Sequence, residues 1–389
     1  MKSFLHIAKR EFGLLFHNKS MFIFAVILPF VSMLFFHTLL NNGVARDLPI
    51  AVIDLDNSSI SRNIISQLDA TPEIMVSYKP TSQLEGEALI KELKVYGLVT
   101  IPKKLGENLN QGKQVSIINQ FNGNLLLPSG LENKAFKKAI GTVSAGINIQ
   151  KQLKQGVNLN QAKANYQPIN SNNHVLSNPY TNYSYYLNSG FLTLFFQIFV
   201  ILTTIYCFGI DLKFNKGEKL YNIGKGNITT IILGKIVPYT LWFLLVGLVM
   251  YFTMFIIGDF PLNGNKTVVL LALFLLITAS QAFAILFLAI SSSFREALTF
   301  GSGFAAIGLS FSGITFPIFG MPKILQLMSQ LFPYTHFFDL FLDQTQRGIP
   351  VFYSFNSIVF LVVLTILPIL ISFRKLTRLL KKGSFLQRI

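Results

Sequence analysis

The amino-acid sequence predicts a polytopic α-helical membrane protein with six transmembrane helices, re-entrant outer helices and an inserted α/β extracytoplasmic domain. The first observation is composition: 51% of the 389 residues are hydrophobic, only 13% are charged, and the mean hydropathy is +0.50. The second is the distribution of the apolar runs. One run of membrane length fills 21–40, a mostly polar stretch fills 41–186, and further apolar runs occupy most of 187–373. An uncharged helix of about 20 residues rises roughly 30 Å, which matches the hydrocarbon core of a bilayer.

Residues 1–20 are expected to form a cytoplasmic amphipathic helix in the membrane interface. Phe4, Ala8, Phe12 and Phe16 recur at every fourth position and make one apolar stripe. The alternative is a basic flank that only sets topology. The run at 21–40 is too long for the apolar region of a signal peptide, and no clear cleavage site follows it, so it is predicted to be an uncleaved first transmembrane helix.

Residues 41–186 have the pattern of an α/β domain. Helices are expected up to Leu68, over 82–94 and over 124–155, and the Asn-rich segment 156–183 is expected to be a stalk or loop. Four strands are predicted from short runs rich in β-branched residues: PIAVIDLD (49–56), IMVSY (74–78), YGLVTI (96–101) and QVSIINQ (114–120).

Transmembrane helices 2–6 are predicted within 187–373, followed by a basic cytoplasmic tail at 374–389. Residues 316–345 are apolar but interrupted by Pro322 and Pro333, which favours short re-entrant helices over a full span. The five further spans are expected at 187–210, 231–257, 267–290, 297–319 and 351–373.

The formal charge of +16 is concentrated beside the apolar runs rather than in a nucleic-acid-binding patch. Short segments on the side of the termini are richer in Lys and Arg than those on the opposite side. The positive-inside rule therefore predicts a multi-pass membrane protein with both termini cytoplasmic and 41–186 extracytoplasmic. Membrane lipids are the expected partners of these cations, and no nucleic acid is expected.

Motifs of enzyme chemistry are weak in this chain. Asp54-Leu55-Asp56 resembles the start of a haloacid dehalogenase phosphatase, but Ser58 replaces the usual Thr or Val, which favours a strand end and helix cap. The five histidines have no metal-ligand spacing. Gly234-Lys235 is followed by Ile236 and does not form a phosphate-binding loop. No catalytic residue, metal site or bound cofactor is therefore predicted.

The cores of the predicted spans offer few groups for an ion or proton relay. Their polar side chains are uncharged, so the energy for transport is expected from a cytoplasmic partner rather than from an ion gradient. These side chains are Gln197, Thr203, Thr204, Ser280 and Gln281.

Four stretches carry a family resemblance: AVIDLDNSSISR (51–62), LGKIVPYT (233–240), TASQAF (278–283) and SGITFPIFGMPKILQLMSQLFPYTHFF (312–338). Together they resemble the permease subunit of ABC transporters of the ABC-2 (type V exporter-like) family, in the bacterial subgroup with a large external domain after the first helix. This resemblance implies a location in the bacterial cytoplasmic (inner) membrane. The loop at 211–222 departs from the family pattern E-x-x-x-G-T because it lacks the Thr.

The resemblance implies a subunit without enzymatic activity that works as a dimer with a second permease copy or a homologous permease. ATP and Mg would be held by separate ABC ATPase subunits, and a periplasmic adaptor protein is a further candidate partner. The ATPase would contact the N-terminal helix and a coupling loop at 211–226, and the broken segment would form the outer gate. The implied coupling residues are Lys9, Arg10, Glu11, Asp211, Lys216 and Glu218; the implied gate residues are Phe316, Pro317, Met321, Pro322, Phe332 and Pro333.

The expected function is ATP-driven export of amphipathic compounds such as drugs or lipids. Two alternatives stay open from the sequence: a sodium exporter of the same architecture, and a membrane-anchored receptor or envelope-interaction protein whose bundle is only an anchor.

Overall fold

The computed structural model describes residues 2–41, 43–168, 174–178, 182–383 and 385. Parts of the segment 156–183 and of the basic tail lie outside these residues. The chain divides into two compact units: residues 44–174, here called the inserted domain, and a helical bundle formed by 1–43 and 175–389. Each unit has its own hydrophobic core.

The bundle begins with two helical segments that meet at Asn18. Helix α1 (Lys2–His17) ends there, and the Asn18 side chain accepts hydrogen bonds from the backbone N–H groups of Ser20 and Met21 in the first turn of the next helix. The first long apolar helix follows as α2 (Lys19–Phe22), a π-helical turn (Ile23–Ile27) and α3 (Leu28–Leu39). A helix boundary at Asn18 therefore separates α1 from the first long apolar helix, and the position of α1 in a membrane interface stays a prediction.

The second half of the chain supplies the rest of the bundle. Among the described residues, five helices are long and apolar enough to cross a membrane: Lys19–Leu39, Ser184–Lys213, Ile228–Ile257, Lys266–Ile290 and Val351–Lys382. They contain α9 (Ser189–Lys213), α11 (Ile228–Phe252), α12 (Lys266–Ile290) and α16 (Phe355–Lys382). Helix α16 continues nine residues beyond 373, so the start of the expected tail is helical.

The predicted fifth span, 297–319, corresponds to α13 (Phe294–Phe311), which is shorter than expected and is not among the five helices above. Its 18 residues rise about 27 Å, and its first turn carries Arg295 and Glu296. It packs on α9, where Gly301 lies against Ile201 and Ile205. The count of six spans therefore stays a prediction.

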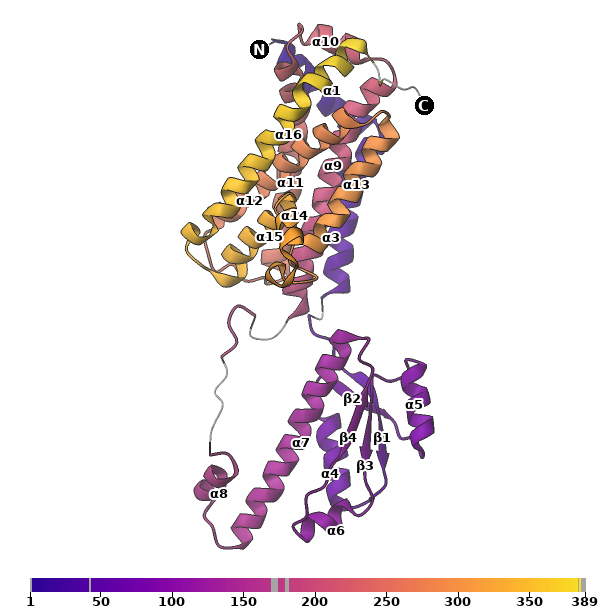
Figure 1. Cartoon of the computed structure of the whole chain (residues 1–389), viewed down its shortest axis with the longest axis vertical. Helices are drawn as coiled ribbons and strands as arrows, with labels where there is room; N and C mark the ends of the chain where they lie inside the picture. The colour runs from indigo at the N-terminus through magenta and orange to yellow at the C-terminus, as the bar shows by residue number, and fades with distance from the viewer. Residues whose placement is uncertain (1, 42, 169–173, 179–181, 384, 386–389) are drawn as a thin grey trace. The chain divides into compact units, whose positions relative to one another are not determined.

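After α13 the chain breaks into short helices in the half of the bundle away from α1 and α10 (Gly217–Ile223) (Figure 1). A 3-10 turn (Ile318–Gly320) and α14 (Lys323–Ser329) are largely exposed, whereas α15 (Pro333–Leu342) is buried among α9, α12, α13 and α16. Proline precedes or begins each piece, because it lacks an N–H and cannot continue a helix. The irregular path expected for 316–345 is observed; its re-entrant position in a membrane stays a prediction.

The inserted domain is a four-stranded sheet in the order β2-β1-β3-β4. Strand β1 (Leu48–Asp54) pairs in parallel with β2 (Ile74–Tyr78) and β3 (Gly97–Ile101), whereas β4 (Ile118–Phe121) is antiparallel to β3. All four strands lie within or beside the predicted runs, and the α/β class is confirmed.

Helices cover both faces of this sheet (Figure 1). Helices α4 (Ser59–Asp69) and α7 (Leu126–Lys154) bury one face with Ile50, Val52 and Val99, while α5 (Gln83–Lys91) covers Ala51, Ile53 and Leu98 on the other. Strand β1, buried on both faces, reads as a continuous apolar run for this reason. Short α6 (Leu105–Asn110) and α8 (Leu159–Tyr166) complete the domain, the latter inside the segment expected to be a stalk or loop.

Candidate functional site: a buried charge network that holds the N-terminal helix

Helix α1 presents two different stripes. Ile7, Glu11 and Leu15, spaced four residues apart, are fully buried against the bundle. The neighbouring apolar stripe stays accessible, with Phe12 52% and Phe16 43% exposed. The second stripe is the one that the sequence predicted for the membrane interface, and the first, which contains a carboxylate, was not anticipated.

Close contact between α1 and α11 is made possible by a glycine. A Cβ at Gly234 would lie 3.0 Å from the Ile7 Cβ and 3.4 Å from the Phe4 carbonyl oxygen. These distances are tight for any larger side chain, so Gly234 lets the two helices approach. The adjacent Lys235 then lies directly opposite Glu11.

Lys235 is the centre of the network, and its side chain is fully buried. Its Nζ donates hydrogen bonds to Glu11 Oε1 at 2.7 Å, to Asp211 Oδ2 at 2.8 Å and to the Cys207 carbonyl oxygen at 3.0 Å. All three N–H donors of the ammonium are therefore used, as a buried cation requires. The Phe208 ring lies below the same ammonium, 5.3 Å from centroid to Nζ.

Arg10 closes the network on its accessible side. Its guanidinium forms a two-pronged hydrogen bond with Asp211, one arm of which measures 3.0 Å, and also approaches Glu11 Oε1 at 3.3 Å. With Lys235 and Arg10 opposite Glu11 and Asp211, two cations balance two anions. A neutral group of charges is the arrangement that a low-dielectric interior tolerates best.

The remaining oxygen of Glu11 has two weaker partners. The Cys207 thiol lies 3.3 Å from Glu11 Oε2, and the Tyr239 hydroxyl lies 3.4 Å from the same atom. Cys207 is the single cysteine of the chain and is buried. The network thus joins three helices. Arg10 and Glu11 belong to α1, Asp211 belongs to α9, and Lys235 belongs to α11.

The structure brings three of the six predicted coupling residues together and leaves three apart. Arg10, Glu11 and Asp211 belong to the buried network, and Asp211 lies inside α9 rather than in a loop. The other three are exposed. Lys9 lines a 590 Å³ groove between α1 and α11, and Lys216 and Glu218 lie at the start of α10. Contact of these six residues with an ATPase stays a prediction.

Sequence reasoning missed Lys235. The span cores were expected to hold only uncharged polar groups, yet this lysine is buried within α11. The available signal was a single cation in an apolar run, within the very stretch LGKIVPYT (233–240) that carried part of the family resemblance. An ionisable residue inside an apolar helix is by default a candidate functional residue whose partner must be found.

Helix α10 is anchored to the end of α16. The Gly217 N–H donates to the Gly383 carbonyl oxygen at 3.2 Å, and Phe385 is buried nearby in the bundle core. The loop between α9 and α11 therefore packs on the last turn of the final long helix, and it presents Lys216 and Glu218 outward.

The predicted gate residues also separate into two groups. Phe316, Pro317 and Pro322 are exposed and Met321 is half-buried, whereas Phe332 and Pro333 are buried. Phe332 stacks between Phe304 and Phe311, at centroid distances of 4.8 Å and 5.1 Å.

Two tyrosine hydroxyls join the chain around this broken segment to α9 and to the π-helical turn (Ser184–Asn188) that precedes it. The Tyr334 hydroxyl contacts the Thr193 hydroxyl at 2.9 Å and the Gly190 carbonyl oxygen, and the Tyr186 hydroxyl donates to the Ile314 carbonyl oxygen at 2.5 Å. The segment is thus hydrogen-bonded to one long helix and stacked on another. A gate function for it stays a prediction.

The Asp54–Asp56 pair of the inserted domain has structural roles. Asp54 accepts from the backbone N–H groups of Asp56 and Asn57 and from the Ser61 hydroxyl at 2.8 Å. Asp56 accepts from the Gly106 N–H at the start of α6. The carboxylates order a turn and a helix start, as the strand-end interpretation expected.

With this geometry in place, comparison with known proteins decides the family. A family model described as "ABC-2 family transporter protein" matches residues 19–374. The chain belongs to the ABC-2 transporter family. The resemblance seen in the sequence is thus confirmed over most of the chain.

Two relatives of this ABC-2 protein give the extent of the similarity. It is 21% identical over 346 residues to the linearmycin resistance permease protein LnrN of Bacillus subtilis (strain 168), covering 86% of this chain and 88% of that protein. It is 24% identical over 368 residues to ABC transporter G family member 20 of Dictyostelium discoideum. That second alignment covers 94% of this chain and 49% of the relative, so the chain spans about half of the longer protein.

Proposed function

We propose that this chain is the permease subunit of an ATP-driven exporter and forms the substrate pathway together with a second permease copy or a homologous permease. Separate ABC ATPase subunits would hold ATP and Mg, both termini would be cytoplasmic, and the inserted domain would lie outside the membrane. Membership of the ABC-2 family supports the transport role. The buried charge network supports the route by which a partner drives it.

The proposed coupling route begins at exposed charges and ends in two long helices. Lys9 on α1 and Lys216 and Glu218 on α10 present charged groups to a partner. A force on α1 passes to α9 through the hydrogen bonds of Arg10 with Asp211, and to α11 through that of Glu11 with Lys235. Any movement of α1 alone would separate buried charges, so α1, α9 and α11 are expected to move as one body.

The proposed outer gate is the broken segment at 316–345. Its exposed part is apolar, with Phe319 88% and Leu327 72% exposed, and its buried part rests on stacked aromatic rings. In the proposed cycle, movement of α9 is felt at this segment through the hydroxyls of Tyr334 and Tyr186.

Amphipathic compounds are the proposed substrates. The relative from Bacillus subtilis is named for resistance to linearmycin, and the gate segment of this chain is lined by aromatic and aliphatic groups. A screen of the reconstituted complex for compounds that stimulate ATP hydrolysis tests this part. Stimulation by sodium ions alone would favour the sodium-export alternative.

The coupling surface is tested by charge reversal in the complex with its ATPase. The triple variant Lys9→Glu, Lys216→Glu and Glu218→Lys is expected to reduce co-purification of the ATPase and substrate-stimulated hydrolysis. A matched control reverses three exposed charges of the inserted domain: Lys91→Glu, Lys154→Glu and Glu107→Lys. If the triple variant binds the ATPase and hydrolyses ATP as the control does, the proposed surface is wrong.

A further inference from the structure

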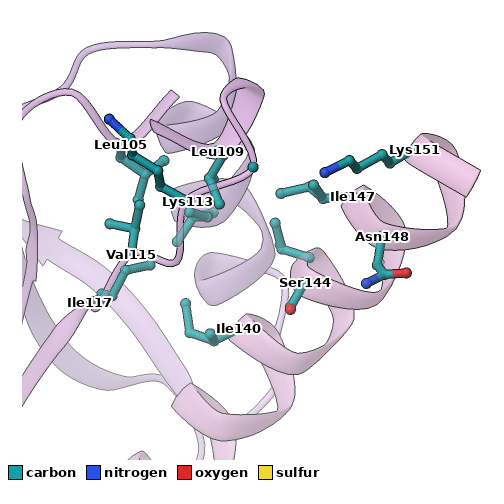
Figure 2. A pocket seen from close by; sticks show the side chains of 13 residues that line it. Leu105, Leu109, Lys113, Val115, Ile117, Ile140, Ser144, Ile147, Asn148 and Lys151 are labelled. Atoms are coloured by element: carbon teal, nitrogen blue, oxygen red, sulfur yellow. The ribbon is translucent and has the colours of Figure 1, made fainter. Parts of the chain in front are cut away.

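The inserted domain contains a cavity of 240 Å³ that the transport role does not explain (Figure 2). It lies between α4, α6, the loop that leads to β4, and the C-terminal half of α7. Its walls are mainly aliphatic: Ile64, Leu105, Leu109, Ile140, Val143 and Ile147. Leu105 and Val143 belong to the domain core, so the cavity opens directly from that core.

Polar groups lie on one edge of the cavity, along α7. Ser144, Asn148 and Lys151 are spaced by four and three residues and therefore share one face of the helix. The Asn148 Oδ1 already accepts a hydrogen bond from Gln152 at 2.7 Å, which leaves its amide N–H groups for other partners. Hydroxyl, amide and ammonium donors thus form a row beside an aliphatic pocket.

Lys151 reaches across the cavity mouth toward the opposite loop (Figure 2). Its Nζ lies 3.1 Å from the point where a Cβ on Gly112 would be, and Gly112 itself has a positive φ of +78°. The positive φ favours glycine at this position, and the absence of a Cβ leaves room for the Lys151 ammonium. Lys113 adds a second cation on that wall, although its ammonium is directed away from Lys151 in Figure 2.

The charge of the lining is one-sided. None of the 13 described residues that line the cavity carries a carboxylate, and Lys151 forms no ion pair with any described residue. A cation above an aliphatic pocket matches a molecule with an anionic head and an apolar body. The volume is below the 300–1,000 Å³ typical of pockets for drug-sized ligands, which favours one flexible chain over a ring system.

We propose that this cavity binds a single-chain amphipathic anion, with its aliphatic chain among Leu105, Ile140 and Ile147 and its anionic head on Lys151, Ser144 and Asn148. The site shares no residue with the coupling route described above, so a test of one proposal does not decide the other. It would give the inserted domain a ligand-binding role that neither the family nor the relatives' names assign.

The test uses the full chain in nanodiscs of zwitterionic lipid, with a ten-carbon carboxylate that carries a diazirine near the end of its chain. After irradiation, mass spectrometry is expected to find the probe on peptides that cover 105–117 and 140–151. Decanoate should compete for labelling, with affinity rising about fourfold per added methylene group up to the length that fills the cavity. Decanol, which has the chain without the charge, should compete at least tenfold more weakly.

Two variants and two matched controls locate the site. Lys151→Gln should weaken labelling about tenfold, and Ser144→Phe should abolish it by filling the cavity mouth from an exposed position. Lys154→Gln is the control for the loss of a lysine, and Thr142→Phe is the control for the added ring. Both positions are exposed on α7 outside the lining, so both variants should be labelled like the wild type. Competition by a decanoyl lysophospholipid with an anionic head, rather than by decanoate, would assign the anion to a lipid source and still support the site. Labelling elsewhere, equal competition by decanol, or wild-type labelling of both Lys151→Gln and Ser144→Phe would overturn the proposal.

Discussion

Removing the Lys235 ammonium should release α1 from the bundle, and the chain carries its own reporter of that event. In Lys235→Met the side chain keeps an unbranched apolar stem but loses the ammonium that donates to Glu11 Oε1 at 2.7 Å and to Asp211 Oδ2 at 2.8 Å. Arg10 alone then faces two carboxylates, and the buried group changes from neutral to a net charge of −1. Breaking a buried ion pair by removing one partner costs about 3–5 kcal/mol.

The cost should be relieved by detachment of α1, which hydrates Glu11. Cys207 lies under this helix, with its Sγ 3.3 Å from Glu11 Oε2, and it is the only thiol of the chain. A shift of about 3 kcal/mol raises the population of the detached state about 100-fold. The rate at which a maleimide labels Cys207 in detergent-solubilised protein should therefore rise by about two orders of magnitude.

A compensating variant separates the charge from the loss of packing. Adding Glu11→Gln to Lys235→Met restores neutrality, with Arg10 opposite Asp211, and the Gln amide retains hydrogen bonds to Tyr239 and Cys207. Labelling should return to within about tenfold of the wild-type rate. Lys216→Met, at an exposed position, is the control and should not change it. Wild-type labelling of Lys235→Met, or faster labelling of the double variant than of the single one, would refute the reasoning.

Three further predictions follow from other contacts. Gly234→Val should weaken α1 docking and speed Cys207 labelling, because its Cβ would lie 3.0 Å from that of Ile7; Gly303→Val, with open space around it, is the control. Phe332→Ala should destabilise the broken segment at 316–345 by about 3–5 kcal/mol, because two stacked rings lose their partner, and limited proteolysis between α13 and α15 should report it. Burial in the inserted domain raises the pKa of Glu132 to about 7 against a hydrogen bond from Asn119 that lowers it. The folded domain therefore holds a proton that the unfolded chain releases from a pKa near 4.5, so stability should fall by about 3 kcal/mol as pH rises from 4.5 to 7 and then level off. Pulse proteolysis in urea should show this dependence in the wild type and not in Glu132→Gln.

Local patterns were enough to predict the helical character of the bundle and the α/β class of the inserted domain. Short apolar runs bounded by polar turns predicted the four strands of the inserted domain, because strands of a sheet that is covered on both faces have such runs. Length and hydropathy similarly identified the long apolar helices. The end of α13 was misplaced by eight residues because hydropathy continues through Ile314 and Phe316, while the helix ends at Phe311 before Gly313, which adopts a positive φ of +86°.

The candidate site was only half predictable, for a physical reason. Glu11 and Lys235 are separated by 224 residues, so no local pattern shows that they pair. On α1 alone Glu11 reads as a member of the polar face, and on α11 alone Lys235 reads as the start of a span. Either charge can be buried only when the other is beside it, and this pairing is visible only in the tertiary structure.

The neutral double variant, Glu11→Gln with Lys235→Met, also separates two roles of the network: docking α1 on the bundle and transmitting force from the ATPase. A buried ion network is a costly way to dock a helix, since apolar residues of similar volume often give equal or greater stability. Its distinguishing property is that small displacements of α1 uncover unpaired charge, which makes docking all-or-none rather than gradual. Glu11→Gln with Lys235→Met keeps α1 docked but removes this penalty, so in the complex with the ATPase we expect hydrolysis to continue while its stimulation by substrate declines. Full stimulation in that variant would mean that the network only fastens α1, and that the force from the partner enters the bundle through α10 and its contact with α16.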